Sequence, residues 1–119
     1  MAEPRTYSGS CHCGQVRYEA TLLLAQVAAC NCSICQKRGA LWAFVPPSNF
    51  KMLAGEGAVA DYQFGKKTIH HLFCPTCGVG SFSRGRGPDG SETIAINARC
   101  LDGVDLAALE VVPFDGRSL

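Results

Sequence analysis

The sequence predicts a mainly β fold made of small antiparallel sheets. Gly and Pro, 13 and 6 of the 119 residues, interrupt the chain along its whole length. The apolar segments between them are short, and some alternate apolar with polar residues as half-buried strands do. A chain of this length fits one compact domain, so we expect a single domain over residues 1–119.

The predicted strands follow one another at close spacing. Val16, Tyr18 and Ala20 alternate with polar residues, which is typical of a half-buried strand. Short apolar runs follow at 25–30 and 41–45, and the second ends at two prolines. The remaining strand candidates are residues 61–64, 68–73 and 93–98, of which the first two form a hairpin that turns at Gly65.

Helix signals occur in two places. Residues 33–38 and 105–109 each have room for about one turn, and Asp105 is a suitable N-cap for the second. Residues 84–92, RGRGPDGSE, are rich in Gly and polar side chains, which predicts a mobile hairpin loop. Helices are therefore a minor part of the predicted fold.

Composition argues against two classes of function. The formal net charge of +1 is too balanced for a protein that binds nucleic acid through phosphate contacts. No apolar run approaches the roughly 20 residues of a membrane helix, and the start, MAEPRTYSGS, has no apolar signal segment. We therefore expect a cytoplasmic protein with neither a membrane nor a nucleic-acid partner. In that reducing compartment, the 8 cysteines indicate metal binding or catalysis rather than disulfides.

Four cysteines form two close pairs that together match a structural zinc site. Cys11 and Cys13 flank His12, and in an extended strand both thiols would face one way and His12 the other. Cys74 and Cys77 lie in FCPTCG, which resembles a zinc knuckle. Two thiolate pairs complete the tetrahedral set that structural zinc prefers. Such an ion would join the first predicted strand to the middle of the chain and stabilise a small domain.

Three further cysteines, Cys30, Cys32 and Cys35, lie together in CNCSICQKRG. Three protein ligands with one open position are typical of a catalytic zinc, and the open position takes water, a substrate oxygen or a substrate thiol. The alternative is a closed structural site in which Cys100 or a histidine supplies the fourth ligand. The spacing favours the open site.

The order of these motifs resembles a known family. GSCHCGQVRYE, CNCSICQKRG, FCPTCG and INARCLDGVD succeed one another as in the family named for the glutathione-dependent formaldehyde-activating enzyme (GFA), over about residues 7–114. The resemblance implies a zinc-stapled β-tent fold and two zinc ions per chain. One would be structural, on Cys11, Cys13, Cys74 and Cys77, and one associated with activity, on Cys30, Cys32 and Cys35. It also implies a carbon–sulfur lyase that acts on the adduct of a small thiol and an aldehyde, as glutathione and formaldehyde form.

Cationic side chains near the second zinc would suit the carboxylates of glutathione. Lys37 and Arg38 follow the triplet closely and are the predicted contacts, although they are equally well explained as solvated surface charges. Trp42 and Phe44 share one face of a strand and are expected in the core.

Four polar residues near FCPTCG and INARCLDGVD are not assigned to a site by the sequence. His70 and His71 are adjacent, so at most one of them faces a given site, and both are read as ordinary residues. Asn97 and Arg99 share a face and either line the site or form structural hydrogen bonds.

Two other functions fit the same sequence. The first is a redox enzyme that uses Cys100 as nucleophile, by analogy with B-type methionine sulfoxide reductases of similar fold. The second is a zinc-stapled module that binds a thiol without turnover. A low pKa at Cys100 would favour the first, and two closed metal sites would favour the second. The sequence gives no indication of an oligomeric state.

Overall fold

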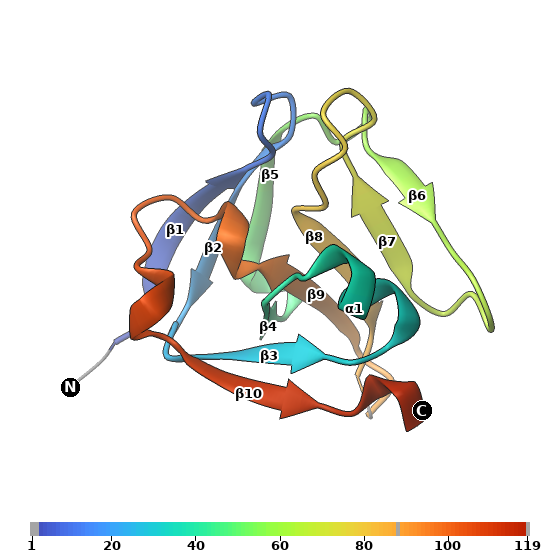
Figure 1. The fold of residues 1–119 in the computed structure, drawn as a ribbon. Helices are drawn as coiled ribbons and strands as arrows, with labels where there is room; N and C mark the ends of the chain where they lie inside the picture. Colours follow the sequence, from blue (N-terminus) through green and yellow to red (C-terminus); the bar gives the residue numbers. More distant parts are fainter. Residues whose placement is uncertain (1–2, 88, 119) are drawn as a thin grey trace.

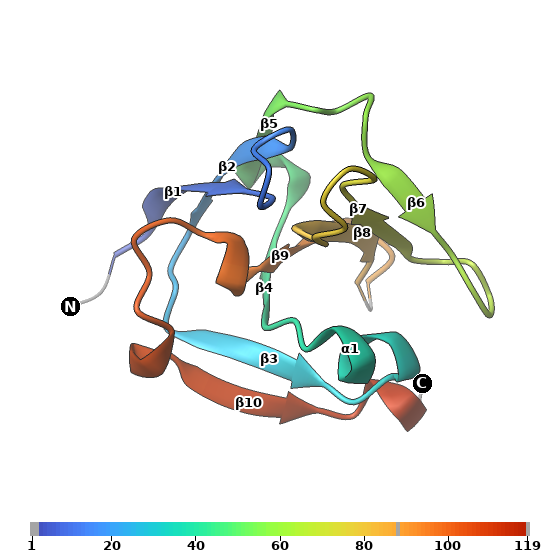
Figure 2. The same cartoon turned by 45° about the horizontal axis from the view of Figure 1, so that its top comes forward.

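The computed structural model describes residues 3–87 and 89–118, and these residues form two β-sheets and one short helix. A three-stranded sheet leans against a seven-stranded sheet, and the main hydrophobic core lies between them (Figures 1 and 2). The predicted mainly β fold class is therefore confirmed. No helix in the described ranges is long and apolar enough to cross a membrane.

The smaller sheet is antiparallel and has the strand order β1-β2-β5. Its strands are β1 (Arg5–Ser10), β2 (Arg17–Leu22) and β5 (Phe50–Ala54). β2 alternates buried and exposed residues, as the sequence pattern predicts, and it lies in the middle of this sheet.

The larger sheet has the order β10-β3-β4-β9-β8-β7-β6. All neighbours are antiparallel except β10 and β3, which run parallel, so the expectation of antiparallel sheets holds for every pair but this one. The strands are β3 (Gln26–Cys30), β4 (Trp42–Val45), β6 (Ala60–Tyr62), β7 (His70–Phe73), β8 (Phe82–Arg86), β9 (Glu92–Asn97) and β10 (Glu110–Phe114).

The helical segments are short. The α-helix α1 (Ser33–Arg38) ends where Gly39 adopts φ 72° and its N–H donates to the carbonyl of Cys35. A predicted cap is confirmed, because the carboxylate of Asp105 accepts from the N–H of Ala107, although the turn that follows is a 3-10 turn. The 3-10 turns are η1 (Pro47–Asn49), η2 (Ala98–Cys100), η3 (Leu106–Ala108) and η4 (Gly116–Ser118).

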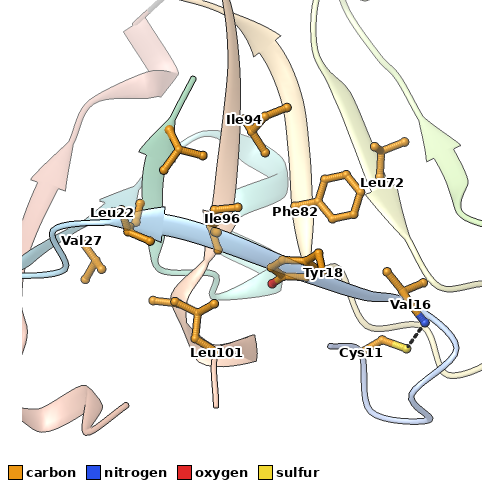
Figure 3. Packing of buried hydrophobic residues seen from close by; sticks show 14 of the residues in the cluster. Cys11, Val16, Tyr18, Leu22, Val27, Leu72, Phe82, Ile94, Ile96 and Leu101 are labelled. Carbon is orange, nitrogen blue, oxygen red and sulfur yellow. Dashed lines mark hydrogen bonds between the residues drawn. The ribbon is translucent and has the colours of Figure 1, made fainter. Parts of the chain in front are cut away.

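Tyr18 is the centre of the core between the sheets (Figure 3). Its side chain is fully buried, its ring lies 5.2 Å from that of Phe50 and 5.7 Å from that of Phe82, and its hydroxyl donates to the carbonyl of Ser81. Gly9 of β1 crosses this ring so closely that a Cβ atom there would lie 2.5 Å from it. The two sheets are therefore joined through one aromatic side chain.

Several local predictions need correction. Residues 84–86 belong to β8 rather than to a loop, and they pair with β9 at the same register as the rest of that strand. Cys11 and Cys13 lie in a bend after β1 rather than within a strand. Phe44 is 58% exposed, so the expectation that it lies in the core is wrong, whereas Trp42 on the same strand face is buried.

Candidate metal centres

The first cluster consists of Cys11, Cys13, Cys74 and Cys77, whose sulfur atoms all lie within 4.8 Å of one another. The sulfur of Cys13 lies 3.7 Å from that of Cys11 and 3.6 Å from that of Cys74. Zinc–sulfur bonds of about 2.3 Å place the corners of a tetrahedron about 3.8 Å apart. The spacing and the all-sulfur donor set therefore fit a tetrahedral zinc ion.

Two loops of similar construction bring these sulfurs together. In the 74–79 loop, the N–H of Gly78 donates to the carbonyl of Cys74, and Gly78 takes φ 82°, which L side chains rarely adopt. In the 11–16 loop, the N–H of Val16 donates to the sulfur of Cys11 at 3.3 Å. Figure 3 shows this contact. The knuckle expected from the C-x2-C-G sequence is thus present.

Backbone N–H groups favour loss of the proton from two sulfurs of this cluster. The N–H groups of Cys13 and Val79 lower the pKa of Cys77 to about 6. The N–H of Cys77 lowers the pKa of Cys74. At Cys13 the N–H of Gln15 also lowers the pKa, but burial and the neighbouring sulfurs outweigh it and raise the pKa to about 11. Since four adjacent thiols cannot all ionise alone, the cluster is suited to a divalent cation that compensates the charge.

The second cluster consists of Cys30, Cys32 and Cys35, and its three sulfurs also lie within 4.8 Å of one another. Cys30 ends β3, Cys32 precedes α1, and Cys35 lies in the first turn of α1, so a strand-to-helix turn gathers all three. In the part of the chain that the structure describes, no other His, Cys, Asp or Glu ligand atom joins this group. These three residues could hold a metal through thiolates alone.

Hydrogen bonds to sulfur orient this cluster. The N–H of Cys32 donates to the sulfur of Cys30 at 3.5 Å, and the indole N–H of Trp42 donates to the sulfur of Cys35 at 3.2 Å. Burial raises the pKa of Cys35 to about 12, against the opposing effect of the Trp42 N–H. Burial also raises the pKa of Cys32, but the N–H groups of Cys35 and Ile34 outweigh it, so the net shift is downward. Holding all three as thiolates therefore requires a cation.

The segment 114–118 covers one side of this triplet, which the sequence analysis did not foresee. A Cβ atom built on Gly116 would overlap the sulfur of Cys30. Asn31, between two of the cysteines, bonds both Asp115 and Arg117 of this segment. Gly116 and Arg117 carry no recognisable motif, so only the parallel pairing of β10 with β3 reveals them.

The two predicted cationic contacts lie on α1, directly after the triplet. The guanidinium of Arg38 lies 5.5 Å from the centre of the Phe73 ring, and a Cβ atom on Gly80 would lie 3.1 Å from its Nη1. Arg38 is thus directed toward β7 and the loop after it. Lys37 is exposed and has no hydrogen bond among the described residues.

The other residues singled out from the sequence do not belong to the three-sulfur group. His71 is buried and stacks on Phe64, whereas His70 is exposed and pairs with Asp61 at 2.6 Å. Asn97 caps η2 and also bonds the carbonyl of Gly80. Arg99 donates to the carbonyl of Gly39 at the end of α1.

Cys100 lies on the side of the four-cysteine cluster. Burial raises its pKa, the nearby Cys11 and Cys77 raise it further, and the Ser81 side chain partly opposes this. Cys100 is not part of the triplet group. The placement therefore leaves Cys100 outside both clusters.

The chain matches known proteins over most of its length. The family model described as glutathione-dependent formaldehyde-activating enzyme matches residues 6–112. A crystal structure of a Rhodobacter sphaeroides protein, a structural genomics target, is 36% identical, with a TM-score of 0.77 over 89% of this chain and 97% of that one. The residues matched by the family model include both cysteine clusters.

Proposed function

This chain belongs to the family of the glutathione-dependent formaldehyde-activating enzyme, and from that premise we propose that it is a zinc-dependent carbon–sulfur lyase. Its substrate is the adduct of a small thiol and an aldehyde, of the glutathione–formaldehyde type. Cys30, Cys32 and Cys35 would hold the zinc ion, which would supply the position at which the thiol is activated.

The observation that carries this proposal is the contrast between the two clusters. Four sulfurs of one group satisfy tetrahedral zinc, whereas the other group offers three. When bound at the triplet, a zinc ion would supply an open position in which a thiol loses its proton or a carbonyl oxygen is polarised. The four-cysteine cluster joins two distant loops and has a structural role in this proposal.

The proposed reaction is balanced without an oxidant or reductant. The thiol sulfur bonds to the aldehyde carbon, and the thiol proton passes to the carbonyl oxygen. The reverse direction breaks the same carbon–sulfur bond and regenerates thiol and aldehyde. The chain's own residues position the metal ligands, since Trp42 holds Cys35 through its indole N–H and the N–H of Cys32 holds Cys30.

The redox alternative has less support from the site. A nucleophilic cysteine needs a lowered pKa and access to solvent. Burial instead raises the pKa of Cys100, and its location beside the four-cysteine cluster separates it from the triplet. A thiol-binding module without turnover shares the same residues with the lyase and differs from it only in rate.

Exchange spectroscopy tests turnover directly. In an equilibrium mixture of ¹³C-formaldehyde and glutathione, NMR exchange measures how fast free formaldehyde and the adduct interconvert. The zinc-loaded protein should accelerate this exchange, Cys32→Ser should abolish the acceleration while the four-cysteine zinc is retained, and Cys100→Ser should preserve it. Thiol binding without acceleration would favour the binding module instead.

A further inference from the structure

We propose that Arg117 recognises the carboxylate of an anionic thiol held at the Cys30, Cys32 and Cys35 site. This inference rests on the proposed function, because it needs a thiol in the open position. It adds a specificity residue from a segment that is far from the triplet in sequence, since Arg117 follows Asn31 by 86 positions.

Asn31 attaches the 114–118 segment to the triplet through three hydrogen bonds. Its backbone N–H donates to the carbonyl of Phe114 at 3.1 Å, and its side-chain amide donates to Asp115 at 2.9 Å. Its side-chain oxygen accepts from the N–H of Arg117 at 2.8 Å. Because Asn31 lies between Cys30 and Cys32, the segment is held at the cluster itself.

Gly116 allows the segment to pack closely against the triplet, because it has no side chain. A Cβ atom on this residue would overlap the sulfur of Cys30 and lie 3.4 Å from the Cβ of Cys32. The backbone beside Arg117 is therefore packed directly on two of the three candidate metal ligands. In Figures 1 and 2 the segment after β10 lies beside α1.

The side chain of Arg117 contacts α1, the helix that carries Cys35. Its Nη2 donates to the side-chain oxygen of Gln36, and the N–H of Gln36 bonds the carbonyl of Cys32, one helical turn earlier. Gln36 therefore holds the Arg117 guanidinium on α1, four residues after Cys32, which is the N-cap of this helix. Gln36 thereby orients Arg117 without neutralising its charge.

The positive charge of Arg117 is only partly compensated among the described residues. The salt bridges within the described residues join Asp61 with His70 and Arg84 with Glu92, and neither involves Arg117. The nearby Asp115 accepts from Ser118 and from Asn31, and these hydrogen bonds lower its pKa; the charge of Arg117 contributes to the same shift, so Asp115 offsets part of that charge. A planar guanidinium with free N–H groups matches a carboxylate, and we therefore assign the ligand class as small thiols that carry one.

Three small thiols of different charge test this inference by binding alone. 3-Mercaptopropionate is anionic, 2-mercaptoethanol is neutral and cysteamine is cationic. Affinities are measured by calorimetry and by the charge-transfer band of protein with cobalt in the triplet. The variants are Arg117→Gln, Arg117→Glu and Lys37→Gln, with Arg5→Gln on the exposed end of β1 as the matched control.

The expected pattern depends on charge. Arg117→Gln should weaken the binding of 3-mercaptopropionate about fivefold to tenfold, as loss of a charge-assisted contact does, and leave the affinity for 2-mercaptoethanol unchanged. Arg117→Glu should weaken the binding of the anionic probe further and strengthen the binding of cysteamine. Added salt should reduce the preference of the wild-type protein for the anionic probe.

Two other results are distinguishable. Normal binding of all three thiols by Arg117→Gln, or a loss that appears only in Lys37→Gln, would overturn the assignment of Arg117 and leave the proposed function intact. Failure of the wild-type protein to bind even 2-mercaptoethanol would overturn the proposed function, and this inference with it.

Discussion

The indole N–H of Trp42 donates to the sulfur of Cys35 at 3.2 Å, from a strand that follows the triplet. We expect Trp42→Phe to weaken the metal site, because the buried Cys35 thiolate loses its hydrogen-bond donor while an aromatic ring remains. A lost hydrogen bond to a charged group costs about 1.5–3 kcal/mol, which corresponds to roughly tenfold to a hundredfold in metal affinity. Chelator competition measures it.

The four-cysteine cluster is the internal control for that experiment. Metal release from Cys11, Cys13, Cys74 and Cys77 should be unchanged in Trp42→Phe, since the indole contacts none of them. Equal weakening of both sites would indicate general destabilisation of the fold and contradict a specific role of the indole N–H.

The two metal sites should differ in lability and in their effect on folding. Chelation should first remove the ion at Cys30, Cys32 and Cys35, whose three ligands hold it less firmly, with circular dichroism unchanged. Removal of the ion from the four-cysteine cluster should then unfold the chain, because the 11–16 and 74–79 loops lose their link. Metal analysis alongside circular dichroism measures both steps. A single ion per fully loaded chain would contradict the prediction.

Motif spacing predicted the two cysteine clusters because each loop is locally determined. The Gly after each C-x2-C or C-x-C pair takes the left-handed conformation that its turn needs, at Gly14 and Gly78. The helix at residues 33–38 was likewise predicted with its bounds. Such features depend on neighbours in sequence, which the sequence alone displays.

The segment over the triplet could not be predicted in that way. All five residues of β10 are exposed, so no alternation of buried and exposed positions marks it as a strand. β10 is defined by its parallel pairing with β3, which places Phe114 opposite Cys30. The burial of Phe44 was predicted wrongly for a related reason. Its side chain lines an open surface hollow together with the exposed Leu23 and Val112.

Gly9 should tolerate no side chain. In Gly9→Ala the new methyl group would lie 2.5 Å from the ring of Tyr18, which is fully buried and cannot move aside. We expect a loss of about 1–3 kcal/mol in the free energy of unfolding, typical of overpacking. Urea denaturation of the zinc-loaded protein measures it. Gly57→Ala is the matched control, because nothing lies within 4 Å of a Cβ atom there.

His71 should make stability depend on pH. Burial and the nearby Arg38 lower its pKa from 6.5, and Asp61 offsets this only in part. The unfolded chain therefore binds the proton more readily, so stability is full above about pH 6.5 and falls as the pH decreases through that value. His71→Phe should reduce this fall. Because the cysteine ligands also titrate, the difference between the two zinc-loaded proteins is the measurement. Identical pH profiles would contradict it.

A thiol that binds at the open position of the triplet should release its proton. The three-sulfur group motivates this prediction, since a fourth thiol would bind as thiolate. Titration of 2-mercaptoethanol in buffers of different ionisation enthalpy should show a heat that varies with the buffer. With cobalt in the triplet, the charge-transfer band should gain intensity as three sulfur ligands become four. Both signals should vanish in Cys32→Ser and persist in Cys100→Ser, which spares both clusters. Their loss in Cys100→Ser would make Cys100 the fourth ligand, and an unchanged band at saturating thiol would mean that the site is closed.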